Sequence, residues 1–259
     1  MILRRLAVNF KEQNWFAVAV AIELVVVVAG VFIGIEVSNW NAGRLQHDAA
    51  RTYVIRLRED LAENIADLQT RKAYYRQVRS HGLAALAAMD RPPASLGPQF
   101  LIDAYEGSQI ITRIVGKNTY DEILSVGAIN SFADVSVRKQ LAFYFLSLRN
   151  SEIALSYIPP YRETLRRHMP YGVQHAITTQ CPEKVMVIGD DSFGAKLAER
   201  CTIDLPVASV ATAVAEVDIP EVRLDLNRCL ADLDLKMLMF DRVIARAKAL
   251  DAFLAQHNS

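Results

Sequence analysis

Glu23 is the residue whose chemistry is least expected from its surroundings, because it lies inside a long apolar run. The run covers residues 15–37 and reads WFAVAVAIELVVVVAGVFIGIEV. An ionisable side chain about two helical turns inside a lipid bilayer costs on the order of 2–3 kcal/mol or more. We therefore expect Glu23 to be protonated, to face a protein partner, or both. A second acid, Glu36, lies near the end of the run, where its side chain can reach the membrane interface.

Two glycines share a helix face with Glu23. Gly30 and Gly34 form a GxxxG pair, and in a helix both fall on the stripe of Glu23. Such pairs let a second transmembrane helix approach closely. The pattern predicts a helix-packing interface made by Glu23, Gly30 and Gly34. The alternative is a chance alignment with Glu23 as a tolerated passenger, and the pattern leaves open whether the partner is a second copy or another protein.

The three cysteines are the next reactive side chains. Cys181 and Cys201 lie in a stretch without helical periodicity. A bond between them would close a loop of about 20 residues and contribute roughly 3 kcal/mol in the chain-entropy model. It would also require an oxidising compartment. The alternative is two unrelated free thiols. Cys229 lies near the apolar stripe of the last predicted helix, where we expect a buried thiol.

No residue pattern points to catalysis or to a cofactor. His168, His175 and Cys181 are separated by seven and six residues, which matches no compact zinc pattern. No phosphate-binding or dinucleotide-binding fingerprint occurs, although catalytic triads assemble from distant positions and leave no such trace. The 29 basic and 29 acidic side chains balance to a net charge of zero, which does not favour nucleic acid as a partner. We expect no enzyme activity, metal or cofactor.

The apolar run predicts the element that carries Glu23. A helix needs about 20 apolar residues to cross about 30 Å of hydrocarbon, so residues 15–37 predict a transmembrane helix after a short tail, residues 1–14. Trp15 and Trp40 bracket the run, as interfacial aromatic anchors do. The alternative is a signal peptide, but the run is too long for one and no cleavage site of small residues follows it.

Basic residues give the expected orientation. Arg4, Arg5 and Lys11 precede the run closely, and short basic tails follow the positive-inside rule best. The other side carries three arginines within about 20 residues, so the count is nearly level; they are Arg44, Arg51 and Arg56. The sequence favours a cytoplasmic N-terminus and a main domain outside the cytoplasm.

Beyond the run, apolar spacing predicts an antiparallel bundle of about four main helices, with residues 44–169 as its first part. We expect a long amphipathic helix from near Leu45 to near Met89. In an alternative, this helix continues from the anchor with only a break at residues 41–43. Thr119 and Glu122 read as a capping box, Gly127 as a helix stop, and Asp134 as the cap of a further helix.

The rest of the chain divides in two. Residues 170–220 lose the helical period and predict a loop-rich insertion, with a short strand at residues 185–188. Residues 221–256 carry apolar side chains at alternating spacings of four and three, and predict the C-terminal helix of the bundle.

The string IELVVVVAGVFIGIEVSNWN resembles the N-terminal anchor of a bacterial family of uncharacterised membrane-anchored proteins, a domain of unknown function. Their anchors place a glutamate early, then a glycine pair, then an Asn-Trp-Asn ending. The matching positions here are Glu23, Gly30, Gly34, Asn39, Trp40 and Asn41.

Two later segments, LREDLAEN (with Leu57, Asp60, Leu61 and Asn64) and TYDEILSVGAINSF (residues 119–132), also resemble the family. The likeness covers about the first 150 residues, and residues 170–220 depart from it. The resemblance implies a bacterial inner-membrane protein with a periplasmic domain and supplies no reaction.

Together these patterns predict a non-enzymatic, membrane-anchored interaction or scaffold subunit. It would contact the lipid bilayer and form a homo-oligomer, or bind another membrane protein, through its transmembrane helix. The alternative is an extracytoplasmic ligand-binding or sensory domain that works through a partner protein. An enzyme with a site in residues 170–220 is the third candidate.

Overall fold

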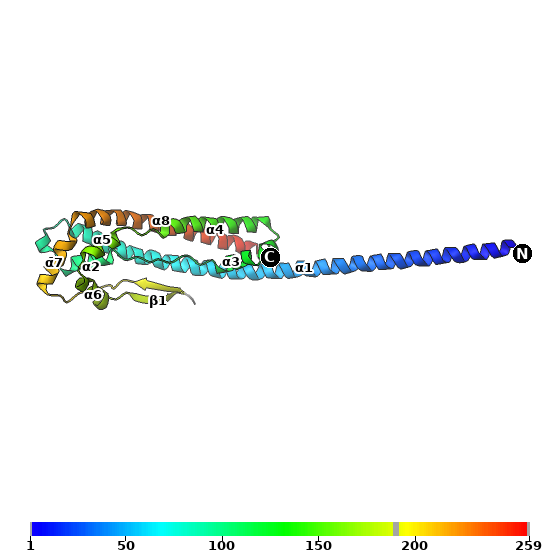
Figure 1. Cartoon of the computed structure of the whole chain (residues 1–259), viewed down its shortest axis with the longest axis horizontal. Helices are drawn as coiled ribbons and strands as arrows, with labels where there is room; N and C mark the ends of the chain where they lie inside the picture. Colours follow the sequence, from blue (N-terminus) through cyan, green and yellow to red (C-terminus); the bar gives the residue numbers. More distant parts are fainter. Residues whose placement is uncertain (1, 189–191, 258–259) are drawn as a thin grey trace.

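A computed structural model describes the backbone of residues 2–188 and 192–257, and the side chains of residues 20–187 and 194–257. Its longest element is α1, Ile2–Ala88. At 1.5 Å per residue, this helix of 87 residues is about 130 Å long. Its first half projects alone and its second half is packed into a helical body (Figure 1). The chain is thus mainly α-helical, with one long apolar N-terminal helix, as predicted.

Two of the remaining elements, α4 and α8, are also long, and the others are short. In chain order they are η1 (Pro93–Ser95), α2 (Pro98–Glu106), α3 (Asn118–Ser125), η2 (Ala128–Ser131), α4 (Val135–Leu155), α5 (Tyr161–His168), α6 (Tyr171–Gln180), β1 (Lys184–Ile188), β2 (Ser192–Lys196), α7 (Val207–Val217) and α8 (Pro220–Gln256). The strands β1 and β2 form an antiparallel hairpin in which Met186 pairs with Gly194.

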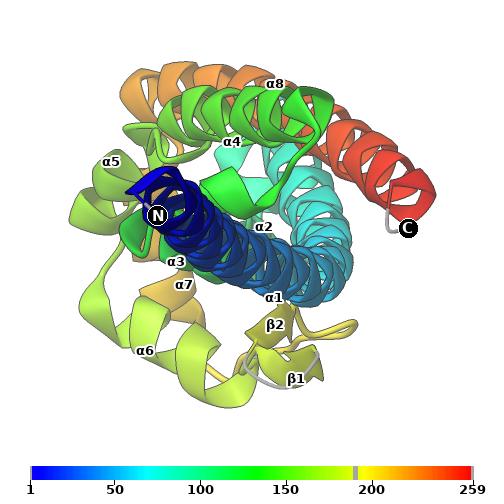
Figure 2. The ribbon, with the colours of Figure 1, turned by 90° about the vertical axis from the view of Figure 1, so that its right-hand side faces the viewer.

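The core of the body lies between α1 and α8, which run antiparallel. The ring of Tyr75 on α1 stacks on Phe240 of α8, with centroids 5.9 Å apart. Helix α4 lies beside α8 on one side of α1, and α6 and the hairpin lie on the other side (Figure 2). Three ion pairs join α1 to α8 along this seam; they are Arg58–Asp251, Lys72–Asp241 and Arg79–Asp234.

Several predicted local features are confirmed. Asp134 caps α4, because its carboxylate accepts a hydrogen bond of 2.7 Å from the Ser136 N–H. Gly127 follows the end of α3 with a φ of 69°, the left-handed conformation that stops a helix. The strand predicted at residues 185–188 is part of β1, and the predicted last helix is α8.

The predicted break at residues 41–43 is wrong, because α1 passes through them without interruption. Gly43 is the only helix-weakening residue there, and a single glycine costs only about 1 kcal/mol in a helix. The capping box at Thr119 is also wrong. Helix α3 begins at Asn118, two residues earlier than a cap at Thr119 implies. The Thr119 N–H donates to the carboxylate of Asp60, 3.1 Å away.

The prediction for residues 170–220 is wrong in part, because the segment contains α6 and α7 beside the hairpin. Proline precedes both helices and marks their starts. In α7 the buried side chains are Val210, Ala213, Val214 and Val217, which follow helical spacing in a run too short and too rich in valine to be recognised. The expected four main helices are three long ones, with short helices completing the core.

Candidate functional site: a lone helix face and a clamped strap

The part of α1 from Val20 to Asp48 contributes no side chain to the core of the body. Every side chain from Val20 to Asp48 is exposed. The apolar part of this stretch is long and apolar enough to cross a membrane. In water such a surface would be unstable, because each exposed apolar side chain forgoes the free energy of burial. The free surface of α1 is therefore the first place to look for function.

Glu23, Gly30 and Gly34 share one line on this free surface. At 100° per residue, both glycines lie within about 20° of the direction of Glu23. A methyl group placed on either glycine would meet no atom within 4 Å. Helix backbone is thus accessible at two consecutive turns, on the same line as Glu23 and beginning about 10 Å along the axis from it.

The continuity of α1 fixes this line relative to the body. The core side chains Leu57, Leu61 and Leu68 are buried, and they lie roughly 180° from Glu23 around a straight helix. The line of Glu23 therefore faces away from α8. Where its extension reaches the body it runs beside the hairpin, with Ala66, Thr70 and Gln77 lining the same hollow as residues of the two strands. Gln77 accepts a hydrogen bond of 3.1 Å from the Leu197 N–H. Between Gly34 and Ala66, over about 48 Å of helix, the residues on this line are exposed; they are Asn41, Asp48, Thr52 and Glu59.

Trp40 fits the expected position at the end of the apolar run. Its side chain is 70% exposed, and the guanidinium of Arg44 lies 5.9 Å from its ring centroid. An aromatic ring beside a cation is typical of the water–lipid interface. Trp15 lies within α1, but its side chain is outside the part of the chain that the structure describes.

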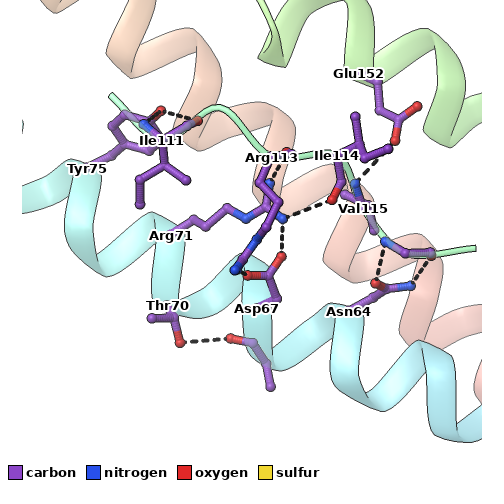
Figure 3. A network of polar contacts seen from close by, with 12 residues as sticks. Asn64, Asp67, Thr70, Arg71, Tyr75, Ile111, Arg113, Ile114, Val115 and Glu152 are labelled. Carbon is purple, nitrogen blue, oxygen red and sulfur yellow. Dashed lines mark hydrogen bonds and ion pairs between the residues drawn. The ribbon is translucent and has the colours of Figure 1, made fainter. Parts of the chain in front are cut away.

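A second polar site lies inside the body and was missed from the sequence. Residues 109–117, here called the strap, connect α2 to α3 as extended chain laid along α1 (Figure 3). Side chains of α1 make hydrogen bonds to backbone N–H and carbonyl groups of the strap. The Tyr75 hydroxyl accepts from the Ile111 N–H at 3.0 Å and donates to the Ile111 carbonyl at 3.2 Å. The amide of Asn64 likewise binds the carbonyl and N–H of Gly116, at 2.7 and 3.1 Å.

A buried ion cluster fixes the middle of the strap. The carboxylate of Asp67 pairs with the guanidinium groups of Arg71 and Arg113. Arg71 also donates to the carbonyls of Arg113 and Ile114, at 2.5 and 3.2 Å. Burial lowers the pKa of Arg71 to about 10, so its guanidinium is charged at neutral pH. The cluster has the geometry of a structural clamp, because its charges are paired within the chain and both terminal nitrogens of Arg71 donate to groups of the chain itself.

The strap has a recognisable sequence signal in hindsight. Its clamps on α1 are polar residues spaced by three or four along the buried stripe; they are Asp60, Asn64, Asp67, Arg71 and Tyr75. Polar residues at core spacing predict an internal polar network that needs a partner segment. The apolar spacing that predicted the helix gave no such indication.

The structure pairs Cys181 with Cys201 in a disulfide whose Cα atoms are 5.4 Å apart. The bond joins the end of α6 to the segment before α7, so it closes the part of the chain that carries the hairpin. Cys229 is a free, buried thiol, and burial raises its pKa to about 12. Such a thiol is unreactive at neutral pH.

The scattered histidines do not come together. His168 lies 3.5 Å from the carboxylate of Glu221, and His175 stacks on the ring of Tyr171. Within residues 2–188 and 192–257, no three His, Cys, Asp or Glu side chains are grouped so that they could hold a metal ion.

The fold and the free helix face thus define a mainly α-helical protein with one N-terminal helix apolar enough to cross a membrane. No known family, curated protein or solved structure matches this chain. The resemblance to the bacterial anchor family stays a prediction.

Proposed function

We propose that the chain is a single-pass membrane protein that assembles with a second transmembrane helix through the line of Glu23, Gly30 and Gly34. One observation carries the proposal: two open glycines and an acid lie on one line of a helix that the body leaves uncovered. Small residues allow backbones to approach closely in lipid. A partner helix would also remove Glu23 from contact with lipid tails.

In this proposal the helical body is a scaffold held at a fixed orientation. The uninterrupted α1 would transmit the geometry of the membrane assembly directly to the body. The basic N-terminal tail favours a cytoplasmic N-terminus and a body outside the cytoplasm, and the disulfide agrees with an oxidising compartment. With the anchor resemblance, this gives a bacterial inner-membrane protein with a periplasmic body.

The continuity of α1 also favours a second candidate, a sensory body that works through a partner protein. A rigid helix running from the core through a membrane can relay a displacement of the body as a rotation or a piston movement. This candidate uses the same interface, because the relayed movement must reach a partner in the membrane.

Co-purification in mild detergent, after crosslinking in the native membrane, tests the interface. We expect Gly30→Ile to reduce the recovered complex at least fivefold, because the added side chain holds the two backbones apart. Ala21→Ile is the matched control, since Ala21 lies roughly 160° from Glu23 on the same helix. Both variants must resist carbonate extraction equally. An unchanged complex in Gly30→Ile, or equal losses in both variants, would refute the interface.

A further inference from the structure

The line of Glu23 continues beyond the apolar run as an exposed face of α1. Between residues 41 and 63, the side chains within about 50° of the direction of Glu23 are all exposed. We call this set the stalk face; its members are Asn41, Leu45, Asp48, Thr52, Ile55, Glu59 and Glu63. A helix that packs on Gly30 and Gly34 could therefore continue along α1 outside the membrane.

The stalk face has the spacing of a surface on which a second helix packs. From Asn41 to Glu59 its members are separated alternately by four and three residues, as along the contact line of paired helices. Two of them are apolar and open to solvent, because Leu45 and Ile55 are 58% and 47% exposed. These two side chains would be buried by a helix that runs alongside α1.

The charges on the stalk face are all negative. Its acids make no side-chain hydrogen bond or ion pair with any residue that the structure describes; they are Asp48, Glu59 and Glu63. The nearest basic side chains, Arg44 and Arg56, lie about 60° to either side of the line, and Arg56 is paired with Glu122 at 2.5 Å. Unpaired acids beside apolar positions are complementary to a helix that carries lysine or arginine.

A second copy of the chain does not fit the stalk face. In a parallel pair, Asp48 and Glu59 of one copy would face the same acids of the other, and like charges disfavour pairing. The hairpin also lies beside this line, at Ala66 and Gln77. Two copies would thus place two hairpins between α1 helices that pack about 8–10 Å apart. Copies that cross at the glycine pair would have to diverge and leave the stalk face uncovered.

We propose that the stalk face binds a basic amphipathic helix that continues from the transmembrane helix of another membrane protein. Apolar side chains of that helix would pack against Leu45 and Ile55, and its lysines or arginines would pair with the three acids. The contact would cover about 33 Å of α1 and end before Ala66, where the hairpin begins. The inference rests on the proposed assembly through the line of Glu23 and specifies the chemistry of the partner.

Photo-crosslinking of the full chain in its native membrane tests the stalk face, with two differently tagged copies expressed together. A photoreactive residue at Leu45 should give at least fivefold more product than one at Gln46, an exposed position about 140° from Glu23. The product should carry one tag only, and the crosslinked partner peptide should contain lysine or arginine. At about 1 M salt, where the screening length is about 3 Å, the yield from Leu45 should fall at least threefold.

Charge reversal provides the matched comparison. With Asp48→Lys and Glu59→Lys combined, the product from Leu45 should fall at least fivefold, because the basic helix is then repelled. Glu216→Lys reverses an exposed acid on α7 and should leave the yield unchanged.

Three results would overturn the proposal. They are a product that carries both tags, equal yields from Leu45 and Gln46, and a yield from Leu45 that resists both high salt and charge reversal. A photoreactive residue at Val27, within the apolar run, separates this proposal from the membrane interface. Product from Val27 without product from Leu45 refutes the stalk face alone, whereas no product from either position refutes the membrane interface as well.

Discussion

Asp67 holds together two cationic side chains, Arg71 in the interior of the body and Arg113, which is 32% exposed, at its edge. Its side chain and that of Arg71 are 6% and 5% exposed, and the same carboxylate pairs with Arg113. The attraction within a buried cluster offsets a large desolvation cost, so the loss of one member leaves an uncompensated charge. The strap therefore depends on Asp67 far more than a surface ion pair would suggest.

We predict that Asp67→Ala lowers the free energy of unfolding by about 3–5 kcal/mol. Asp241→Ala is the comparison, because it removes the pair with Lys72, in which the Asp241 side chain is 54% exposed. That loss should be less than about 1 kcal/mol. Urea unfolding followed by circular dichroism in detergent measures both, and equal effects would contradict the clamp.

At the level of single residues, the sequence predicted burial better than it predicted polar pairing. The amphipathic spacing predicted a buried apolar stripe on this part of α1, and Leu57, Leu61 and Tyr75 are buried on it. Asn64 and Asp67 share that stripe and are also buried, which the apolar spacing did not predict. Apolar periodicity cannot separate a buried polar network from a solvated face, because the partner segment lies about 50 residues away in the chain.

At the level of elements, the two glycines Gly127 and Gly172 should respond to substitution in opposite directions. Gly127 has a φ of 69°, so Gly127→Ala should cost about 1–2 kcal/mol. Gly172 lies in α6 with nothing within 4 Å of an added methyl group, so Gly172→Ala should stabilise by up to about 1 kcal/mol. Thermal unfolding tests the pair, and a Tm shift of the same sign in both variants would contradict the assignment.

Long helices were predicted well and short ones poorly. Helix α8 and the amphipathic part of α1 carry apolar stripes over many turns, so chance deviations do not hide the period. Helix α7 has 11 residues and gains its stability from tertiary packing rather than from its own propensity. Local propensity also does not decide whether two adjoining helices join into one. The break predicted at residues 41–43 was therefore wrong, and α1 continues through them.

At the scale of the whole molecule, α1 links two features in one continuous helix. It carries the open line of Glu23 and ends as the central helix of the body. The position of the body around any membrane partner is therefore set by the helix itself. Sequence periodicity indicated the anchor and the bundle separately, whereas their fixed relation depends on the continuity of α1.

A photo-crosslinking scan of α1 in the native membrane tests the central claim most directly. Val27 and Val37 lie within about 40° of Glu23 around the helix, whereas Val25 and Phe32 lie roughly opposite. With a photoreactive residue at each position in turn, we expect crosslinks from Val27 and Val37 at least fivefold above those from Val25 and Phe32. Equal yields at the four positions, or higher yields from Val25 and Phe32, would contradict assembly through the line of Glu23, Gly30 and Gly34.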